Sequence, residues 1–180
     1  MDLGLEGRSA IVCASSRGLG KGCAMSLAKN GVNVVVNGRN EAVTMATAEE
    51  IRDTTGVDVT PVIADVSTMG GQKALLAACP NPDILVNNNG GPPFRDFRDL
   101  SREEMLEGVT MNFATPIEMV QAVIDNMVTQ RFGRIVNITS VSVLRPVPGL
   151  DLSSGARAGL TAFLAGVART VAQHNVTINH

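Results

Sequence analysis

Short runs of β-branched and other apolar residues alternate with longer stretches of helical periodicity along the whole chain. The predicted strands are Ser9–Cys13, Val32–Val36, Val57–Ala64, Ile84–Asn87, Arg134–Thr139 and Val176–Asn179. The predicted helices are Leu19–Lys29, Glu41–Thr54, Gly70–Ala78, Arg102–Gln130 and Ser154–His174. The strands are continuously apolar, which is typical of parallel strands covered on both faces. This order predicts an α/β fold in which a doubly wound parallel sheet of six strands lies between two helical layers.

The length of 180 residues, of which 44% are hydrophobic, suits one domain covering residues 1–180. No repeat, linker or low-complexity tract interrupts the alternation. The chain stops at His180, directly after the last predicted strand. We therefore expect this domain to lack later segments that would form a lid or a wall of a substrate pocket.

Charge and composition argue against several classes of partner. The net charge is −2 without any block of like charges, and the chain has five Phe but no Tyr or Trp, so nothing indicates a nucleic-acid partner. No apolar run reaches the roughly 20 residues of a membrane span, and the acidic first eight residues do not resemble a signal peptide. The three cysteines lack metal or redox spacing. We expect a soluble cytoplasmic protein with free thiols, no metal and no membrane partner.

A glycine-containing loop follows the first predicted strand and opens into a helix. Its residues are Ala14, Ser15, Ser16, Arg17, Gly18, Leu19 and Gly20. The two glycines allow a tight turn that approaches a pyrophosphate closely, and the helix N-terminus supplies free N–H groups and a positive dipole end. A purely structural glycine turn is the alternative, but the position between strand and helix favours a dinucleotide-binding loop of the Rossmann type.

The end of the second predicted strand indicates which dinucleotide is bound. NAD-binding domains usually carry an acid there for the adenosine 2′-hydroxyl, whereas this chain has Gly38 followed by Arg39. An arginine can hold a 2′-phosphate through two charge-assisted hydrogen bonds, and Arg17 would add a second positive charge. The alternative is that both arginines are ordinary solvated side chains. We predict NADP(H) in preference to NAD(H).

Two further motifs, Asn87-Asn88-Asn89-Gly90 and the run from Gly133 to Ser140, follow the fourth and fifth predicted strands. Together with the glycine loop, they make the chain similar to the short-chain dehydrogenase/reductase family, and within it to the 3-oxoacyl-(acyl carrier protein) reductase-like branch. The resemblance covers nearly all 180 residues. Family members usually continue through a seventh strand and a substrate-binding loop, which are missing here and which determine most of the substrate specificity.

The resemblance implies roles for residues around the cofactor. Asp65 and Val66 would lie beside the adenine, and Asn88, Asn89 and Gly90 would border the cofactor. For Asp65 the alternative is a helix cap for the segment that begins near Ser67, and the asparagines could be turn residues alone.

Asn112 matches the family's asparagine in the long helix before the fifth strand. Ser101 and Glu104 form a capping-box pattern that begins this helix. Pro116 has no N–H to donate to the carbonyl of Asn112, four residues earlier. The resemblance implies that this free carbonyl holds a water that relays protons, and a merely structural kink is the alternative.

The catalytic motif departs from the family pattern of a serine, a tyrosine 13 positions later and a lysine four further on. Ser140 fills the first position, but Ser153 and Arg157 occupy the other two, and the chain contains no tyrosine to substitute. A serine hydroxyl ionises far less readily than a phenol, whose pKa is about 10, and it is too short to reach the same place. Arg157 can still offer charge and hydrogen bonds to a ribose, but it will not exchange protons near neutral pH. Asp151 is one alternative acid.

Three functions remain open at this point. The first is an NADP(H)-dependent oxidoreductase acting on a small-molecule carbonyl or secondary alcohol, with a 3-oxoacyl thioester as one substrate class. The second is an NADP(H)-binding protein with little or no turnover. The third is a structural role in assembly, because the apolar residues of Ala156–Ala172 cover much of that helix's circumference. We expect a homodimer or homotetramer, since helices flanking the fifth strand form interfaces in the family.

Overall fold

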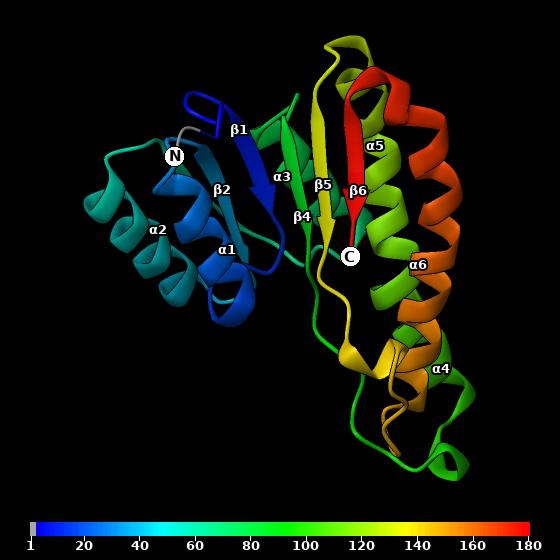
Figure 1. Ribbon diagram of the computed structural model, residues 1–180. Coiled ribbons are helices and arrows are strands. Elements are labelled where there is room, and N and C mark those ends of the chain that lie inside the picture. The colour runs from blue at the N-terminus through cyan, green and yellow to red at the C-terminus, as the bar shows by residue number, and fades with distance from the viewer. Residues whose placement is uncertain (1–2) are drawn as a thin grey trace.

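The computed structural model describes residues 3–180, so Met1 and Asp2 of the acidic N-terminal segment lie outside the described residues. Its centre is a parallel sheet of six strands in the order β3-β2-β1-β4-β5-β6 (Figure 1). The strands are β1 Ser9–Val12, β2 Asn33–Gly38, β3 Val59–Ile63, β4 Ile84–Asn87, β5 Gly133–Asn137 and β6 Val176–Asn179. All six predicted strands are therefore present, and the predicted doubly wound architecture is confirmed.

The helices follow the predicted pattern with one interruption. They are α1 Gly18–Ala28, α2 Glu41–Thr55, α3 Met69–Ala78, α4 Arg102–Val109, α5 Thr115–Thr129 and α6 Asp151–Val171. Short 3₁₀ turns lie at η1 Phe97–Asp99, η3 Val141–Val143 and η4 Ala172–His174. The helix predicted over Arg102–Gln130 as one element is divided by a π-helical turn, η2 Thr110–Ala114. The last helix begins at Asp151, three residues before the predicted Ser154.

Polar side chains fix where several helices begin. The Ser101 hydroxyl accepts from the Glu104 N–H while the Glu104 carboxylate accepts from the Ser101 N–H, which confirms the predicted capping box. Thr68 caps α3 by accepting from Gly71. The alternative of Asp65 as this cap is wrong, because its carboxylate instead accepts two hydrogen bonds from Ser67 within the preceding turn.

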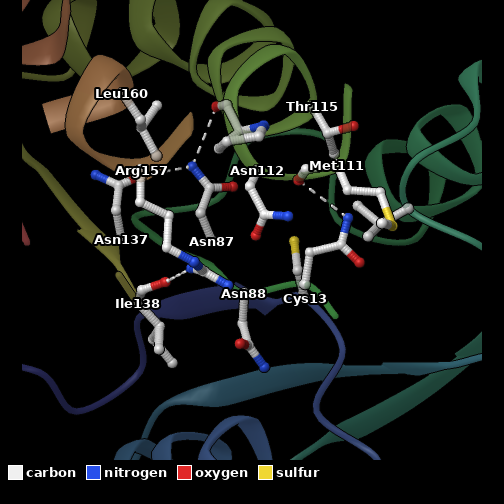
Figure 2. A pocket seen from close by; sticks show the side chains of 13 residues that line it. Cys13, Asn87, Asn88, Met111, Asn112, Thr115, Asn137, Ile138, Arg157 and Leu160 are labelled. Atoms are coloured by element: carbon white, nitrogen blue, oxygen red, sulfur yellow. Dashed lines mark hydrogen bonds between the residues drawn. The ribbon is translucent and has the colours of Figure 1, made fainter. Parts of the chain in front are cut away.

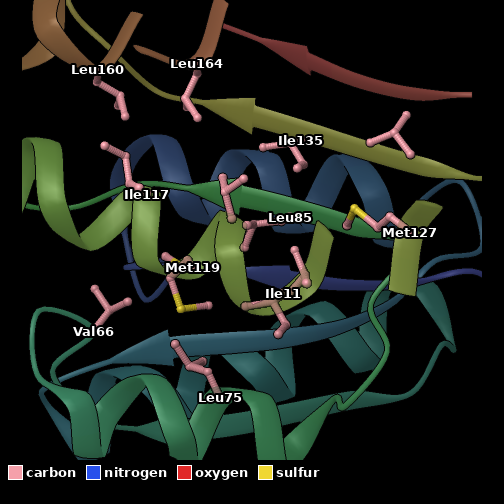
Figure 3. Packing of buried hydrophobic residues seen from close by; sticks show 14 of the residues in the cluster. Ile11, Val66, Leu75, Leu85, Ile117, Met119, Met127, Ile135, Leu160 and Leu164 are labelled. Carbon is pink, nitrogen blue, oxygen red and sulfur yellow. The ribbon is translucent and has the colours of Figure 1, made fainter. Parts of the chain in front are cut away.

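Two apolar layers enclose the sheet. On one face, α1 and α2 pack through Ala24, Ala28, Ala48 and Ile51 against alternate side chains of the strands. On the other face, α3, α5 and α6 contribute a larger cluster whose members include Leu75, Met119, Val123, Met127, Leu160 and Leu164 (Figure 3). Adjacent residues of β4 belong to opposite clusters, since Leu85 faces the second and Val86 the first. Both faces of the sheet are thus dry, as the continuous apolar runs predict.

The π-helical turn changes the backbone pairing just before Pro116. The Thr115 N–H donates to the Thr110 carbonyl, five residues earlier. In that register the next carbonyl, that of Met111, faces Pro116, which has no N–H. The Asn89 side chain donates to the Met111 carbonyl instead, at 3.3 Å. The turn therefore directs the Met111 carbonyl toward the loop that follows β4. That the Asn112 carbonyl is free stays a prediction.

No helix within residues 3–180 combines the length and the apolar character needed to cross a bilayer.

Candidate functional site

The candidate site lies at the carboxyl edge of the sheet, where the strand order reverses. From β1 the chain winds outward to β2 and β3, and it then returns to β4 on the other side of β1. Loops that leave β1 and β4 therefore diverge, and such a switch point is where open α/β sheets bind ligands. The loops after β4 and β5 extend beyond this edge toward α4 and the start of α6 (Figure 1).

Three buried asparagines lie at or next to the carboxyl ends of strands at this edge. Asn37 of β2 is 1% exposed, Asn87 of β4 is 5% exposed and Asn137 of β5 is 1% exposed. The Asn37 side chain accepts from the Ala14 N–H and donates to the carbonyls of Val62 and Ala64. Its amide thereby ties the glycine loop to β3. Such buried amides remain stable only because their polar atoms are paired.

The side chains of Asn87 and Asn137 likewise join neighbouring elements on the other half of the sheet. Asn87 donates to the Asn137 side chain at 3.0 Å and to the Pro116 carbonyl at 3.1 Å. Asn137 in turn donates to the Asn179 carbonyl of β6 at 3.2 Å. This chain of amides connects β4, β5, β6 and α5, so the floor of the site is rigid.

The glycine loop requires unusual backbone conformations. Gly18 has φ +58°, and Ala14 has φ +44°, a conformation that favours glycine. A Cβ at Gly20 would lie 2.4 Å from the Ala14 carbonyl oxygen, so only glycine fits there. The Asn88 side chain donates to that same carbonyl at 3.1 Å and joins the loops after β1 and β4.

The residues of this loop divide between structural and ligand-facing positions. Ser15 is fully buried, and its hydroxyl donates to the Val12 carbonyl at 2.6 Å and accepts from the Asn37 N–H at 2.8 Å. Its side chain therefore holds the loop, although it was predicted to contact the cofactor. Ser16 and Arg17 instead line an open groove. Leu19 lies exposed in the first turn of α1.

The N-terminus of α1 has no side-chain cap, since the Arg17 side chain at the N-cap position forms no capping hydrogen bond. The first N–H groups of an α-helix lack partners within the helix, and together with the helix dipole they attract anions. Phosphate oxygens are the ligands that suit such an end.

The groove continues to the ends of β2 and β3 and is open to solvent. It is lined by Ala14, Ser16, Arg17, Asn37, Gly38, Arg39, Asn40, Ala64, Asp65, Val66, Asn89, Gly90 and Met111. A Cβ at Gly38 would lie 2.4 Å from the Thr44 hydroxyl and 2.6 Å from Ser16, which leaves no room for an acidic side chain. The structure thus brings together most of the residues predicted to bind the cofactor.

Arg39 and Asp65 face each other across this end of the groove. Their charged groups are 3.6 Å apart, and the Arg39 side chain is 79% exposed. The Ser67 hydroxyl lowers the pKa of Asp65, and the neighbouring Arg39 lowers it further. Because Arg39 is so loosely held, its guanidinium is free to contact a phosphate.

A second, smaller cavity adjoins the groove beneath the π-helical turn (Figure 2). Its lining includes Cys13, Asn88, Asn112, Thr115 and Arg157. The oxygen of the Asn112 side chain and the Thr115 hydroxyl are buried without a hydrogen-bond partner among the described residues. Burial raises the pKa of the Cys13 thiol to about 12, so this group is neutral.

Arg157 reaches from α6 into this cavity. Its Nη1 donates to the Ile138 carbonyl at 2.5 Å (Figure 2). Its Nε donates to the Ser153 hydroxyl at 3.2 Å. Burial lowers the pKa of the guanidinium. No carboxylate within residues 3–180 forms a salt bridge with it. The cavity therefore contains one positive charge that neutral groups surround.

The predicted catalytic serines stand on different elements. Ser140 follows β5 and caps η3, and its side chain is partly exposed. Ser153 lies in the first turn of α6, is 7% exposed and accepts the hydrogen bond from Arg157. Sequence reasoning missed Ser142, which is 1% exposed. The hydroxyl oxygens of Ser142 and Ser140 are 2.8 Å apart. It also missed Asn37 and Asn137, for which the only signal was an asparagine at the end of an apolar run.

No cluster of three or more His, Cys, Asp or Glu side chains suited to a metal ion occurs in the described part of the chain.

Comparison with known proteins agrees with this geometry. Residues 8–180 match the model of the family described as short chain dehydrogenase. The 3-oxoacyl-[acyl-carrier-protein] reductase of Chlamydia muridarum is 33% identical over an alignment of 179 residues, and the match covers 97% of this chain and 72% of that protein. The inactive hydroxysteroid dehydrogenase-like protein 1 of Homo sapiens is 35% identical over an alignment of 164 residues, and the match covers 87% of this chain and 49% of that protein.

A solved structure shows the same architecture. A metagenomic short-chain oxidoreductase in complex with NADP superposes with a TM-score of 0.88 at 27% identity, over 97% of this chain and 80% of that one. The described strands and helices therefore have counterparts in a protein of known cofactor.

Proposed function

The chain belongs to the short-chain dehydrogenase family, and we propose that it is an NADP(H)-dependent oxidoreductase that interconverts a small-molecule carbonyl compound and a secondary alcohol. The observation that carries this proposal is the groove at the switch point. At this groove the N-terminus of α1 has no side-chain cap, and the space around Gly38 is too small for an acidic side chain. The guanidinium of Arg39 is only weakly held there.

Each part of the groove suits one part of the cofactor. The free N–H groups at the start of α1 would bind the pyrophosphate, and Arg39 with Arg17 would bind the 2′-phosphate. Asp65 and Val66 would border the adenine, and Asn88 to Gly90 would border the nicotinamide half. The solved relative in complex with NADP supports the choice of a phosphorylated dinucleotide.

When bound, the nicotinamide supplies or accepts the hydride at the substrate carbon. Ser140 would donate a hydrogen bond to the carbonyl oxygen. Arg157, whose charge has no carboxylate partner among the described residues, would stabilise negative charge that develops there, because electrostatic stabilisation is strong in a site shielded from water. The proton that completes the alcohol would come from water, since Ser153 is a poor acid and its side chain is buried.

The second function is NADP(H) binding without turnover. It rests on Ser153 and Arg157, which replace the tyrosine and lysine of the family's catalytic motif. The buried Ser153 offers no ionisable group, and a relative at 35% identity is an inactive dehydrogenase-like protein. The groove for the cofactor does not depend on these residues, so binding and catalysis are separable.

One assay distinguishes the two functions. NADPH oxidation is followed at saturating NADPH with a panel of simple ketones and 3-oxoacyl thioesters, using the native chain and the variant Ser153→Tyr/Arg157→Lys. We expect slow oxidation by the native chain and a rate at least about 100-fold higher for the double variant, the typical contribution of a general acid. Arg157→Lys alone is the control and should give little gain. Tight NADPH binding without oxidation by either protein would support the second function.

We also propose that the chain forms a homodimer or homotetramer through α4 and α6. Apolar side chains are exposed on these helices, with Leu106 at 56%, Met105 at 43% and Phe163 at 47%. Exposed apolar side chains that gather on packed helices often mark an interface. Light scattering should give a mass of two or four chains at micromolar concentration, and a monomer would exclude the interface.

A further inference from the structure

Ser140 and Ser142 form a hydroxyl pair immediately beyond β5. Their Oγ atoms are 2.8 Å apart, and the Ser142 N–H donates to Ser140 Oγ at 3.1 Å. The second contact makes Ser140 the cap of the short turn η3. One lone pair of the Ser140 oxygen is therefore already used by the backbone.

The difference in burial between the two side chains decides which hydroxyl donates to the other. Ser142 is 1% exposed, and Ser140 Oγ is the one hydrogen-bond partner of its hydroxyl within residues 3–180. If Ser140 donated, the Ser142 proton would be buried without an acceptor, which costs free energy. Ser140 is partly exposed, so its own proton can reach water or a ligand. The hydroxyl proton of Ser142 therefore points at Ser140.

From this asymmetry we propose that Ser142 is a positioning residue, which makes the Ser140 hydroxyl a dedicated hydrogen-bond donor to the substrate carbonyl oxygen. Ser140 Oγ accepts from both the N–H and the O–H of Ser142, so its acceptor capacity is filled and its proton is directed outward. Hydrogen bonds in such a chain polarise one another, so Ser140 becomes a stronger donor than an isolated serine.

This role matters because Ser153 and Arg157 on α6 occupy the positions where the family has its catalytic tyrosine and lysine. The Ser153 hydroxyl is buried and accepts a hydrogen bond from Arg157. Ser140 is then the more accessible of the two predicted catalytic hydroxyls. The inference rests on the proposed oxidoreductase function for its consequence in catalysis, but the direction of the hydroxyl pair is a property of the protein alone.

Neutron diffraction from deuterium-exchanged crystals of the native chain tests the direction without any turnover. We expect the deuterium of Ser142 to lie on the line between the two oxygens and that of Ser140 to lie off this line. A Ser140 deuterium on this line would overturn the proposal, whether or not the protein oxidises NADPH.

Kinetics test the consequence. Ser142→Ala should lower kcat for ketone reduction about 10-fold, the effect of losing one hydrogen bond, and should leave the NADPH affinity unchanged. Ser140→Ala should cause a larger loss, and Ser140→Ala/Ser142→Ala should lose no more than Ser140→Ala. Ser142→Cys, which keeps a weak donor, should recover part of the rate.

Ser154 provides the matched control, because its hydroxyl donates to the Leu150 carbonyl within α6 and lies outside this pair. Ser154→Ala should keep the native kcat. Equal rates for Ser142→Ala and the native chain would overturn the positioning role. Additive losses in the double variant would also overturn it, because they would mean that Ser142 acts independently of Ser140. Absence of any oxidation by the native chain would remove the catalytic consequence together with the proposed function, and the neutron result would still decide the direction.

Discussion

The side-chain amide of Asn87 donates to the side-chain oxygen of Asn137 at 3.0 Å, and this bond joins the carboxyl ends of β4 and β5 beneath the candidate site. Asn137 extends the connection to β6 through the carbonyl of Asn179. The floor of the site is therefore held by side chains as well as by the ladder of backbone hydrogen bonds.

Replacing this amide should weaken the whole sheet edge. Asn137→Ala removes an acceptor of Asn87 and the donor to Asn179, and each is a buried or partly buried bond. We expect a loss of about 1–3 kcal/mol in the free energy of unfolding, measured by urea denaturation. The exposed Asn126 on α5 is the control, and Asn126→Ala should change stability by less than about 0.5 kcal/mol. Equal stabilities of the two variants would contradict the role of Asn137.

Two glycines on α1 should respond oppositely to the same substitution. A Cβ at Gly20 would lie 2.4 Å from the Ala14 carbonyl, whereas a Cβ at Gly22 would meet nothing within 4 Å. Gly20→Ala should destabilise the fold by about 1–3 kcal/mol and abolish cofactor binding. Gly22→Ala should stabilise it by about 0.5–1 kcal/mol, because alanine favours the helix. Thermal unfolding and NADPH titration measure both effects. A Gly20→Ala protein that is stable and binds NADPH would contradict the close contact between position 20 and the Ala14 carbonyl.

Asp65 should give the site a defined dependence on pH. The Ser67 hydroxyl donates to its carboxylate at 2.6 Å and lowers the Asp65 pKa in the folded state. The resulting stability is present above the unfolded pKa, which is about 4, and is lost as the pH falls through the folded pKa.

Ser67→Ala should raise the Asp65 pKa toward its ordinary value and make the loss of stability at acid pH shallower. Carboxyl NMR titration measures the first effect, and unfolding at neutral and acid pH measures the second. Ser26→Ala on the exposed side of α1 is the control. An unchanged Asp65 pKa in Ser67→Ala would show that the hydroxyl is not the cause.

Arg39 should discriminate between the two dinucleotides. Its side chain is 79% exposed and its guanidinium lies 3.6 Å from the Asp65 carboxylate, so it can turn to a 2′-phosphate. Arg39→Ala should weaken NADPH binding about 10- to 100-fold, as expected for charge-assisted hydrogen bonds, and should leave NADH binding unchanged. Arg102→Ala, on α4, is the charge-matched control. A parallel loss for both dinucleotides would mean that Arg39 does not contact the phosphate.

The sequence predicted the sheet well, because a parallel strand buried on both faces leaves a continuous apolar run such as the one at Val34–Val36. It also identified the glycine loop, since only a few residue types tolerate the backbone near Gly18. The π-helical turn at Thr110–Ala114 was not predicted, because Pro116 indicates that a hydrogen bond is lost but not how the pairing shifts around it.

The candidate site was predicted less completely than the fold. Ser15 carries the loop motif, yet its side chain turns inward, and a motif does not specify the direction of a side chain. Ser142 belongs to no motif, and its importance depends on a burial that only the packed structure shows. Asn137 is similar, since its partners Asn87 and Asn179 are distant in sequence.

The central claim, that the groove receives a phosphorylated adenosine, is tested most directly by calorimetric titration of the native chain with NADPH and with NADH at equal ionic strength. The account predicts saturable binding of NADPH at one site per chain and at least about 10-fold weaker binding of NADH. Equal affinities would contradict the role of the arginines, and no heat from either dinucleotide would contradict the account as a whole.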